Sequence, residues 1–150
     1  MDRTRTYMHR ALVQARNAAS AGEVPVGAVV VRKGEIIAES HNQPRGTSDP
    51  TAHAEILALR AAAARLGTDR LTDCDLWVTL EPCTMCAGAI AHARIRRLYY
   101  GAADPKGGAV DSGVNFFAAA TCHHAPEVYS GFEEAESTAL LREFFKDRRD

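Results

Sequence analysis

The sequence has no apolar run that approaches the roughly 18 residues needed to span a membrane. Its first segment, MDRTRTYMHRALVQARNAASAG, also lacks the apolar core of a secretory signal peptide. The apolar residues of that segment recur instead at the spacing of an amphipathic helix packed on one face. We therefore expect a cytoplasmic protein without a membrane segment.

Cysteine is scarce, with four residues in 150: Cys74, Cys83, Cys86 and Cys122. A chain of this length can bury a core of its own, and without a secretory signal it has no use for a disulfide scaffold. Metal binding or catalysis is the better interpretation of so few thiols.

A strong charge of either sign is missing too, since the formal net charge is −1. The protein is therefore no polycation, and any contact with nucleic acid must come from a local basic patch. The sequence also lacks internal repeats, low-complexity tracts and long Pro/Gly/Ser linkers. We expect residues 1–150 to form a single domain.

The patterns that are present predict strands alternating with helices. Strands are predicted at residues 27–31, 35–40, 76–80 and 95–101, with a tight turn at Lys33 and Gly34. Helices are predicted at about residues 4–21, 52–67, 82–95 and 132–149, with Pro82 near the first position of the third. This alternation indicates a layered α/β sheet with helices on both faces.

Two stretches are predicted to be loops. HNQPRGTSDP, at residues 41–50, is polar, and residues 102–126 are rich in Gly, Ala and Asp. A loop as long as the second one, inside a compact domain, is usually functional.

The stretch TLEPCTMCAG, residues 79–88, places Cys83 and Cys86 three positions apart after an apolar run. Such a pair is found in redox couples, in structural zinc sites and in catalytic zinc sites. The flanking residues lack the Trp-Cys-Gly-Pro-Cys pattern of thioredoxin-like couples. A structural site needs four protein ligands, usually in two close pairs, and only one pair exists here. His123 and His124 beside Cys122 are better interpreted as loop side chains that face solvent or substrate.

A catalytic zinc site needs three protein ligands and an open position for water. Of the six histidines, His53 differs because it opens a predicted helix and Glu55 follows two residues later. Cys83 and Cys86 lie at the start of the next helix, and two facing helix N-termini favour thiolates and hydroxide. His-x-Glu followed thirty residues later by Pro-Cys-x-x-Cys is the signature of the zinc deaminases. We therefore predict a catalytic zinc site.

The chain resembles the cytidine deaminase superfamily and, within it, the bacterial tRNA-specific adenosine deaminases of the TadA type. The resemblance covers nearly the whole chain, in EVPVGAVVV (23–31), HNQP (41–44), DPTAHAEILALR (49–60), LWVTLEPCTMCAGAI (76–90), HARIRRLYYGAADPKGGAVDSG (92–113) and LLREFFKDRR (140–149). The zinc motif marks the superfamily, whereas GAADPKGGA and the basic tail point to the tRNA branch. The fold implied is a three-layer α/β/α sandwich with a central, mostly five-stranded mixed sheet.

The resemblance implies a hydrolase that converts the wobble adenosine, position 34 of a tRNA anticodon, to inosine, with arginine tRNA as substrate. It also implies a homodimer in which both subunits line the site for the anticodon stem-loop. His53, Cys83 and Cys86 would hold one Zn²⁺ per subunit, and Glu55 would be the catalytic proton shuttle. The implied substrate contacts are Asn42, Ala54, Asp104, Lys106, Phe145, Arg148 and Arg149. The chain departs from the family at His123-His124, where relatives carry Asn-His, so no contact is carried over to that loop.

Two basic clusters remain open to either interpretation, as phosphate contacts or as solvated surface. The first comprises Arg94, Arg96 and Arg97. The second comprises Arg142, Lys146, Arg148 and Arg149, for which the resemblance favours RNA contact. Of Phe144 and Phe145, one is expected to pack in the core and the other is available to support a base.

Two rival functions also stay open. The first is a deaminase of a free nucleobase or nucleoside, such as guanine or cytosine, which needs a closed pocket and no basic rim. The second is a zinc-stabilised RNA-binding module without turnover, although such a module has no use for Glu55 beside an open metal position.

Overall fold

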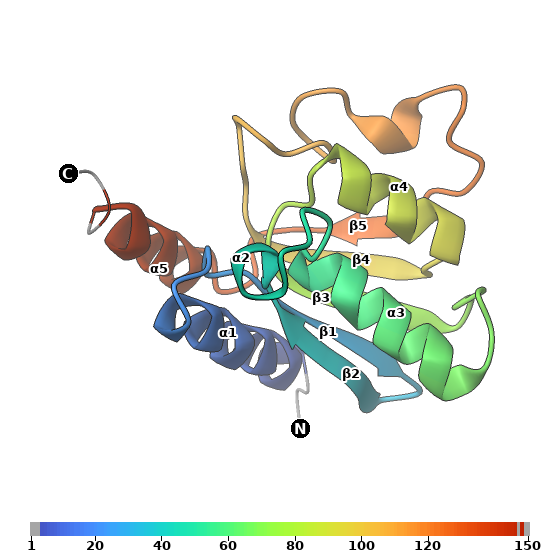
Figure 1. Ribbon diagram of the computed structural model, residues 1–150. Helices are drawn as coiled ribbons and strands as arrows, with labels where there is room; N and C mark the ends of the chain where they lie inside the picture. The colour runs from blue at the N-terminus through green and yellow to red at the C-terminus, as the bar shows by residue number, and fades with distance from the viewer. Residues whose placement is uncertain (1–3, 147, 149–150) are drawn as a thin grey trace.

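A five-stranded mixed sheet forms the centre of the protein in the computed structural model, which describes residues 4–146 and 148 (Figure 1). Its strands are β1 (Gly27–Arg32), β2 (Glu35–His41), β3 (Cys74–Leu80), β4 (Arg97–Ala102) and β5 (Glu127–Tyr129). They lie in the order β2-β1-β3-β4-β5, with β1 antiparallel to both neighbours and β3, β4 and β5 mutually parallel. The expected mixed sheet is confirmed.

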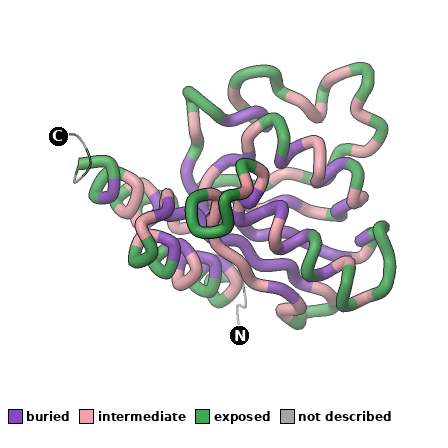
Figure 2. Tube along the Cα trace, viewed as in Figure 1, coloured by how far each residue is buried: buried purple, intermediate pink, exposed green. Residues whose placement is uncertain are grey.

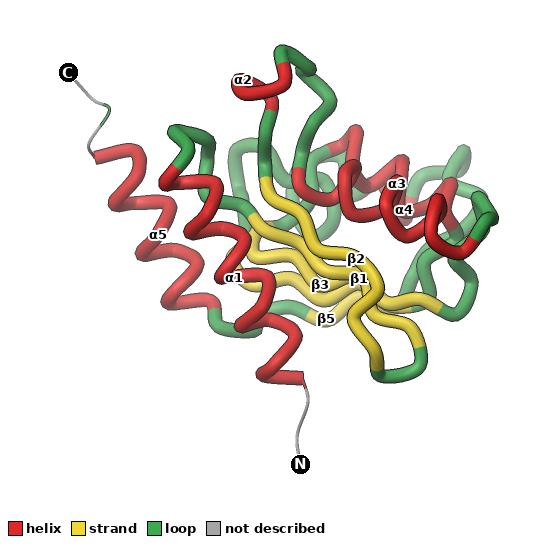
Figure 3. Tube along the Cα trace, turned by 60° about the horizontal axis from the view of Figure 1, so that its bottom comes forward, coloured by secondary structure: helices red, strands yellow, loops and turns green. Residues whose placement is uncertain are grey.

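Helices cover both faces of this sheet, which gives the three layers that were predicted. Helices α1 (Thr4–Ser20) and α5 (Glu134–Lys146) lie together on one face (Figure 3). Helices α3 (Ala54–Leu66) and α4 (Thr84–Ala93) lie together on the other face. Within the described residues, no helix combines the length and the apolar character that a membrane crossing requires.

The alternation of side chains along β1 divides the core into two halves. Val29 and Val31 pack with Met8 of α1 and with Trp77, whereas Val30 packs on the opposite face with the α3 side of the core. Successive residues of a strand point to opposite faces, so a strand covered by helices on both sides must be apolar throughout. Figure 2 shows the resulting band of buried chain through the centre of the sheet.

An aromatic cluster joins the sheet to the α1 and α5 layer. The Trp77 ring stacks on Tyr99 with centroids 3.9 Å apart and meets Tyr7 and Phe132 at 5.6 and 5.2 Å. These rings come from β3, β4, α1 and the segment before α5. The cluster therefore fixes where α5 begins relative to the sheet.

Two local predictions, the turn between the first two strands and the end of the second long helix, are confirmed because each depends on the backbone conformation of a glycine. Lys33 and Gly34, with φ of +50° and +79°, form the turn between β1 and β2. Gly67, with φ of +68°, caps the C-terminus of α3. Both glycines take the left-handed conformation that other residues adopt only with strain.

Several boundaries differ from those expected. Helix α3 begins at Ala54 rather than residue 52, and α4 begins at Thr84, so Pro82 is not in its first turn. Pro82 is instead held outside the helix, where its carbonyl accepts a hydrogen bond from Ala109 N–H at 2.9 Å. The two predicted loops contain short elements, namely α2 (Pro44–Thr47) in the first and the 3₁₀ turn Phe116–Ala118 in the second. Strand β5 follows directly after the second loop.

Candidate metal and catalytic site

Two helices that run side by side bring the predicted metal ligands together. His53 is the N-cap residue of α3, Cys83 is the N-cap residue of α4, and Cys86 lies in the first turn of α4. The N-cap residues of both helices have extended backbones, with ψ of 153° for His53 and 177° for Cys83. Both helices therefore present their positive dipole ends to the same place (Figure 1).

The donor atoms of these three residues fit one metal ion. His53 Nδ1 lies 3.6 Å from Cys83 Sγ and 3.5 Å from Cys86 Sγ, and all three donor atoms lie within 4.8 Å of one another. In a tetrahedral zinc site, bonds of about 2.3 Å to sulfur and about 2.0–2.1 Å to nitrogen place these atoms about 3.6 Å apart. Among the described residues, no other group of His, Cys, Asp and Glu side chains gathers in this way. The arrangement leaves the fourth tetrahedral position to a non-protein ligand.

The two thiols are electrostatically unequal. A hydrogen bond from Cys86 lowers the pKa of Cys83 to about 4, and the interaction with His53 acts in the same direction. The same hydrogen bond, together with burial, raises the pKa of Cys86. The hydrogen bond with Cys83 also raises the pKa of His53. Cys83 is thus the more readily deprotonated of the two thiols, and a divalent cation would favour the thiolate form of both cysteines.

Glu55 lies one residue into α3 and is buried, with 4% of its surface exposed. Burial raises the pKa of its carboxyl to about 7. A carboxyl with a pKa near neutrality both accepts and releases a proton under physiological conditions. Its place beside the ligand cluster suits the proton-shuttle role that was predicted, which stays a prediction.

Asn42 and Ala54, two of the predicted substrate contacts, contact each other. The buried Asn42 side chain follows β2, and its Oδ1 accepts the N–H of Ala54 at 2.7 Å. That N–H is the first of α3 and has no carbonyl within the helix to bond. Asn42 therefore ties the end of β2 to the helix that carries His53 and Glu55, and its role toward substrate stays a prediction.

A hollow between the loop after β4 and helix α5 collects other predicted substrate residues. Asp104, Lys106, Phe145 and Arg148 share one pocket of about 490 Å³. An adjoining pocket of about 690 Å³ adds Arg142 and Lys146. Phe144 is buried and Phe145 is 47% exposed, as expected for one core ring and one available ring. Arg149 lies outside the described residues.

The arginines before β4 already have acidic partners. Arg96 forms two hydrogen bonds with Asp75, at 2.9 and 2.8 Å, and Arg97 Nε lies 2.8 Å from Glu127. Arg94 caps the C-terminus of α4 in a left-handed conformation. These contacts favour a structural role for the first basic cluster over phosphate binding.

The segment with His123 and His124 is anchored to the sheet by one of its histidines. His124 Nε2 lies 2.7 Å from the carbonyl oxygen of Ile95, and Cys122 Sγ donates to the His124 carbonyl at 3.1 Å. His123 is exposed. Of this histidine pair, His124 is thus half-buried and bonded to the sheet, whereas His123 lies at the surface.

Glu81 was missed by the sequence analysis. It is buried between β3 and Cys83, and its carboxylate accepts hydrogen bonds from residues 104–112. Its position before Pro82 was visible in the sequence, but its partners lie 23 to 31 residues further along the chain. No local sequence pattern predicts a contact over this distance along the chain.

Comparison with known proteins identifies the family. The model of the MafB19-like deaminase family matches residues 1–149. A tRNA-specific adenosine deaminase of Agrobacterium fabrum is 61% identical over 143 residues, which are 95% of this chain and 94% of that protein. The chain belongs to the tRNA-specific adenosine deaminase family.

Solved structures agree with membership of this deaminase family. A tRNA:A34 deaminase studied for A-to-I editing at the wobble position of transfer RNA gives a TM-score of 0.90 at 61% identity. The match covers 91% of this chain and 99% of that one. A guanine deaminase from Nitrosomonas europaea gives 0.83 at 28% identity, covering 96% and 85%. The fold is therefore shared with solved deaminases that are named for different substrates.

Replacement of Asn42 tests whether its hydrogen bond to the N–H of Ala54 stabilises this deaminase. Asn42→Ala leaves the buried N–H of Ala54 without its acceptor, so we expect the free energy of unfolding to fall by about 1–3 kcal/mol in urea titrations. Asn42→Asp keeps an acceptor oxygen and should recover most of the loss. The matched control Asn17→Ala, on the exposed face of α1, should change stability by less than about 0.5 kcal/mol. Equal stability of Asn42→Ala and wild type would contradict the assignment.

Proposed function

We propose that this protein hydrolyses the wobble adenosine of a tRNA anticodon to inosine, with Zn²⁺ as its metal and arginine tRNA as its substrate. The observation that carries the proposal is the convergence of His53, Cys83 and Cys86 beside the buried Glu55. The names of the relatives support the substrate class.

The chemistry divides between the metal and one carboxylate. His53, Cys83 and Cys86 would hold the zinc ion, which would lower the pKa of a bound water from about 15.7 towards 7. Glu55 accepts the proton of the attacking water and delivers it to N1 of adenine. A bond forms between the water oxygen and C6. Glu55 then takes the second proton from the hydroxyl on C6 and gives it to the amino nitrogen, whose bond to C6 breaks, so that ammonia leaves and a carbonyl remains at C6. One water is consumed and one ammonia released, so a single carboxyl with a pKa near neutrality suffices for both transfers.

The hollow beside α5 supports RNA as the carrier of the adenine. A base must leave its stack to enter a buried site, and anticodon loops present unstacked bases. Phe145 offers an exposed ring for stacking, while Lys106, Arg142 and Lys146 line the same hollow and can neutralise phosphates.

Glu55→Gln tests the mechanism and the substrate together. We expect turnover of the wobble adenosine in an arginine-tRNA anticodon stem-loop to fall by about 10²–10⁴-fold, because general acid–base transfer is lost. Zinc content should stay at the wild-type level. RNA sequencing, which reads inosine as guanosine, measures the conversion. Glu35→Gln, an exposed site at the β1–β2 turn, is the control and should keep full activity.

Free adenosine, guanine and cytosine, assayed by ammonia release, complete the substrate panel. Conversion of the wobble adenosine alone supports the proposal. Turnover of a free base with unchanged RNA would instead establish the nucleobase deaminase alternative, which the guanine deaminase neighbour exemplifies. Full turnover by Glu55→Gln would remove Glu55 from the mechanism.

Metal content tests the ligand set separately from activity. Cys86→Ser replaces a buried thiolate donor, so we expect most of the zinc to be lost when metals are measured by mass spectrometry. Cys122→Ser changes a cysteine that donates to the His124 carbonyl instead, and should keep one zinc per chain. Equal zinc in the two variants would contradict the assignment of Cys86.

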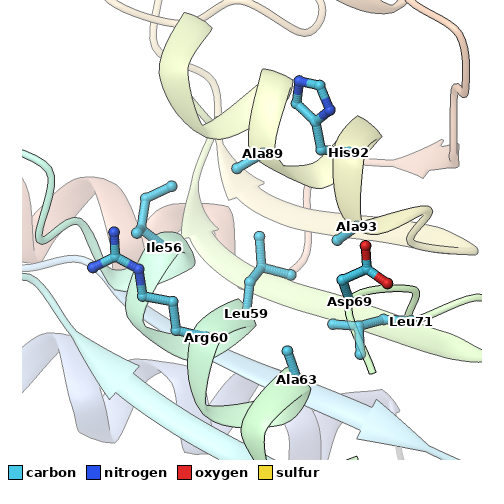
Figure 4. Close-up of a pocket in the computed structure, with 9 residues that line it drawn as sticks. All are labelled: Ile56, Leu59, Arg60, Ala63, Asp69, Leu71, Ala89, His92 and Ala93. Carbon is cyan, nitrogen blue, oxygen red and sulfur yellow. The ribbon is translucent and has the colours of Figure 1, made fainter. Parts of the chain in front are cut away.

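We further propose that the protein is a homodimer and that the outer groove between α3 and α4 receives the second copy. The groove has a volume of about 450 Å³ (Figure 4). Its apolar floor and walls are Ile56, Leu59, Ala63, Leu71, Ala89 and Ala93. Arg60, Asp69 and His92 are exposed around it, so the rim carries charges of both signs. A copy related by a two-fold axis presents the same surface and can meet each charge with its opposite.

A matched pair of substitutions on α3 tests this interface. Ala63→Glu places a charge inside the groove, so we expect monomers in analytical ultracentrifugation. Ala64→Glu makes the same change at the next, exposed residue and should leave the dimer intact. A monomeric wild type, or an unaffected Ala63→Glu dimer, would contradict the proposed interface.

A further inference from the structure

Glu81 is a buried acid at the junction of the sheet and the metal-ligand helix. It follows the last residue of β3 directly and precedes Cys83 by two positions, and 2% of its surface is exposed. Burying a carboxylate is costly unless hydrogen bonds replace the water it loses. The partners of Glu81 therefore indicate what the residue is for.

All five donors to the Glu81 carboxylate come from a single loop, residues 104–112. Oε1 accepts the N–H of Asp104 and the hydroxyl of Ser112, both at 2.9 Å. Oε2 accepts the N–H groups of Val110, Asp111 and Ser112 at 3.1, 2.9 and 3.0 Å. Four backbone N–H groups thus converge on one side chain, which satisfies donors that an irregular loop would otherwise leave unpaired.

The loop backbone also packs directly against Glu81. A Cβ added to Gly108 would lie 2.5 Å from Glu81 Cδ and 2.7 Å from Oε1, closer than any real contact. On either side of the carboxylate, Glu81 N–H donates to the Ala102 carbonyl and Ala109 N–H donates to the Pro82 carbonyl, each at 2.9 Å. The loop is therefore fastened to the Glu81-Pro82 pair by main chain and side chain together.

This loop carries Asp104 and Lys106 to the hollow that they share with Phe145. We propose that Glu81 is a positioning residue, which sets the place of the loop 104–112, and so of Asp104 and Lys106, relative to the helix that bears Cys83 and Cys86. The inference rests on the proposed function for its substrate, while the hold of Glu81 on the loop is independent of any substrate.

Glu81→Gln removes the hydrogen bond to the Asp104 N–H and keeps the bonds to residues 110–112. With its oxygen at the Oε2 position, glutamine keeps the three N–H bonds of residues 110–112, and the Ser112 hydroxyl can turn to accept from the amide. The amide NH₂ then faces the N–H of Asp104, where two donors meet without an acceptor. The substitution therefore frees the start of the loop, where Asp104 and Lys106 lie, with little change in volume.

Hydrogen–deuterium exchange and steady-state kinetics of the zinc-loaded protein provide the test. We expect peptides covering residues 104–112 to exchange about tenfold faster or more in Glu81→Gln, with α4 and the sheet unchanged. We expect KM for the anticodon stem-loop to rise about tenfold with a much smaller change in kcat, because positioning for binding is lost rather than proton transfer. Zinc content and melting temperature should stay close to wild type.

A second variant reaches the same contact from the loop side. Gly108→Ala drives a methyl group into the Glu81 carboxyl and the Asp104 carbonyl, at 2.5 and 2.6 Å, without altering Glu81, and should reproduce both effects. Gly88→Ala is its control, because the added methyl would meet nothing within 4 Å. Asp75→Asn removes another buried carboxylate at the far end of β3 and should lower stability while leaving KM unchanged.

Each outcome decides the inference. Faster loop exchange together with a raised KM supports it. Wild-type exchange in both Glu81→Gln and Gly108→Ala overturns it, as does faster exchange with an unchanged KM. Loss of zinc in parallel with KM would place the effect on α4 and also overturn it. If the wild-type protein leaves the RNA unchanged, the proposed function fails, and the exchange data alone decide whether Glu81 holds the loop.

Discussion

The convergence of three donor atoms from two helices is the constraint on which the rest of this structure depends. His53 and Cys83 are 30 residues apart, yet their donor atoms lie within 3.6 Å. Flexible loops could not maintain such a distance, because a metal site tolerates errors of only about 0.2 Å in its bonds. Both residues are instead N-caps, at points where a helix begins against a sheet buried on both faces. The core thus positions the chemistry, and the helix dipoles favour the thiolate charge there.

Around this centre, buried side-chain oxygens accept backbone N–H groups that no helix or sheet bond satisfies. Asn42 holds the first N–H of α3, Glu81 holds the loop 104–112, and Glu23 accepts the N–H groups of Arg45 and Gly46 at the short helix α2. Each side chain supplies hydrogen-bond acceptors to backbone N–H groups that are shielded from water and have no carbonyl partner. Hydrogen bonds to buried side chains therefore fix the position of the segments around the site.

Substrate choice in this family depends on what surrounds the shared centre. The tRNA:A34 deaminase and the guanine deaminase both superpose on this chain with TM-scores above 0.8, so the fold does not distinguish the substrates for which they are named. The features that favour RNA here are peripheral, namely the exposed Phe145 ring and the cations beside it on α5. Leu140 of helix α5 packs against the cluster formed by Met8, Ala11 and Leu12 of α1, and exposed ion pairs join Arg16 to Glu136 and Arg5 to Glu133, the residue before α5. The residues proposed to contact RNA therefore lie on a helix that packs on the opposite face of the sheet from the helices that carry His53, Cys83 and Cys86.

The sequence by itself predicted the grouping of His53, Cys83 and Cys86 that the structure brings together. It also determined the strands of the β1–β2 hairpin with its turn at Lys33 and Gly34, and the alternation of strands and helices. Each of these is specified by residue spacing or by a backbone conformation within a few positions. Tertiary structure alone decided that β5 is a three-residue strand, that Phe144 rather than Phe145 is buried, and that Arg96 and Arg97 are paired with acids. It also decided that Glu81 reaches a loop 23 to 31 residues away. These features arise from burial and from hydrogen bonds between distant segments, whose free energy exists only once the chain is folded.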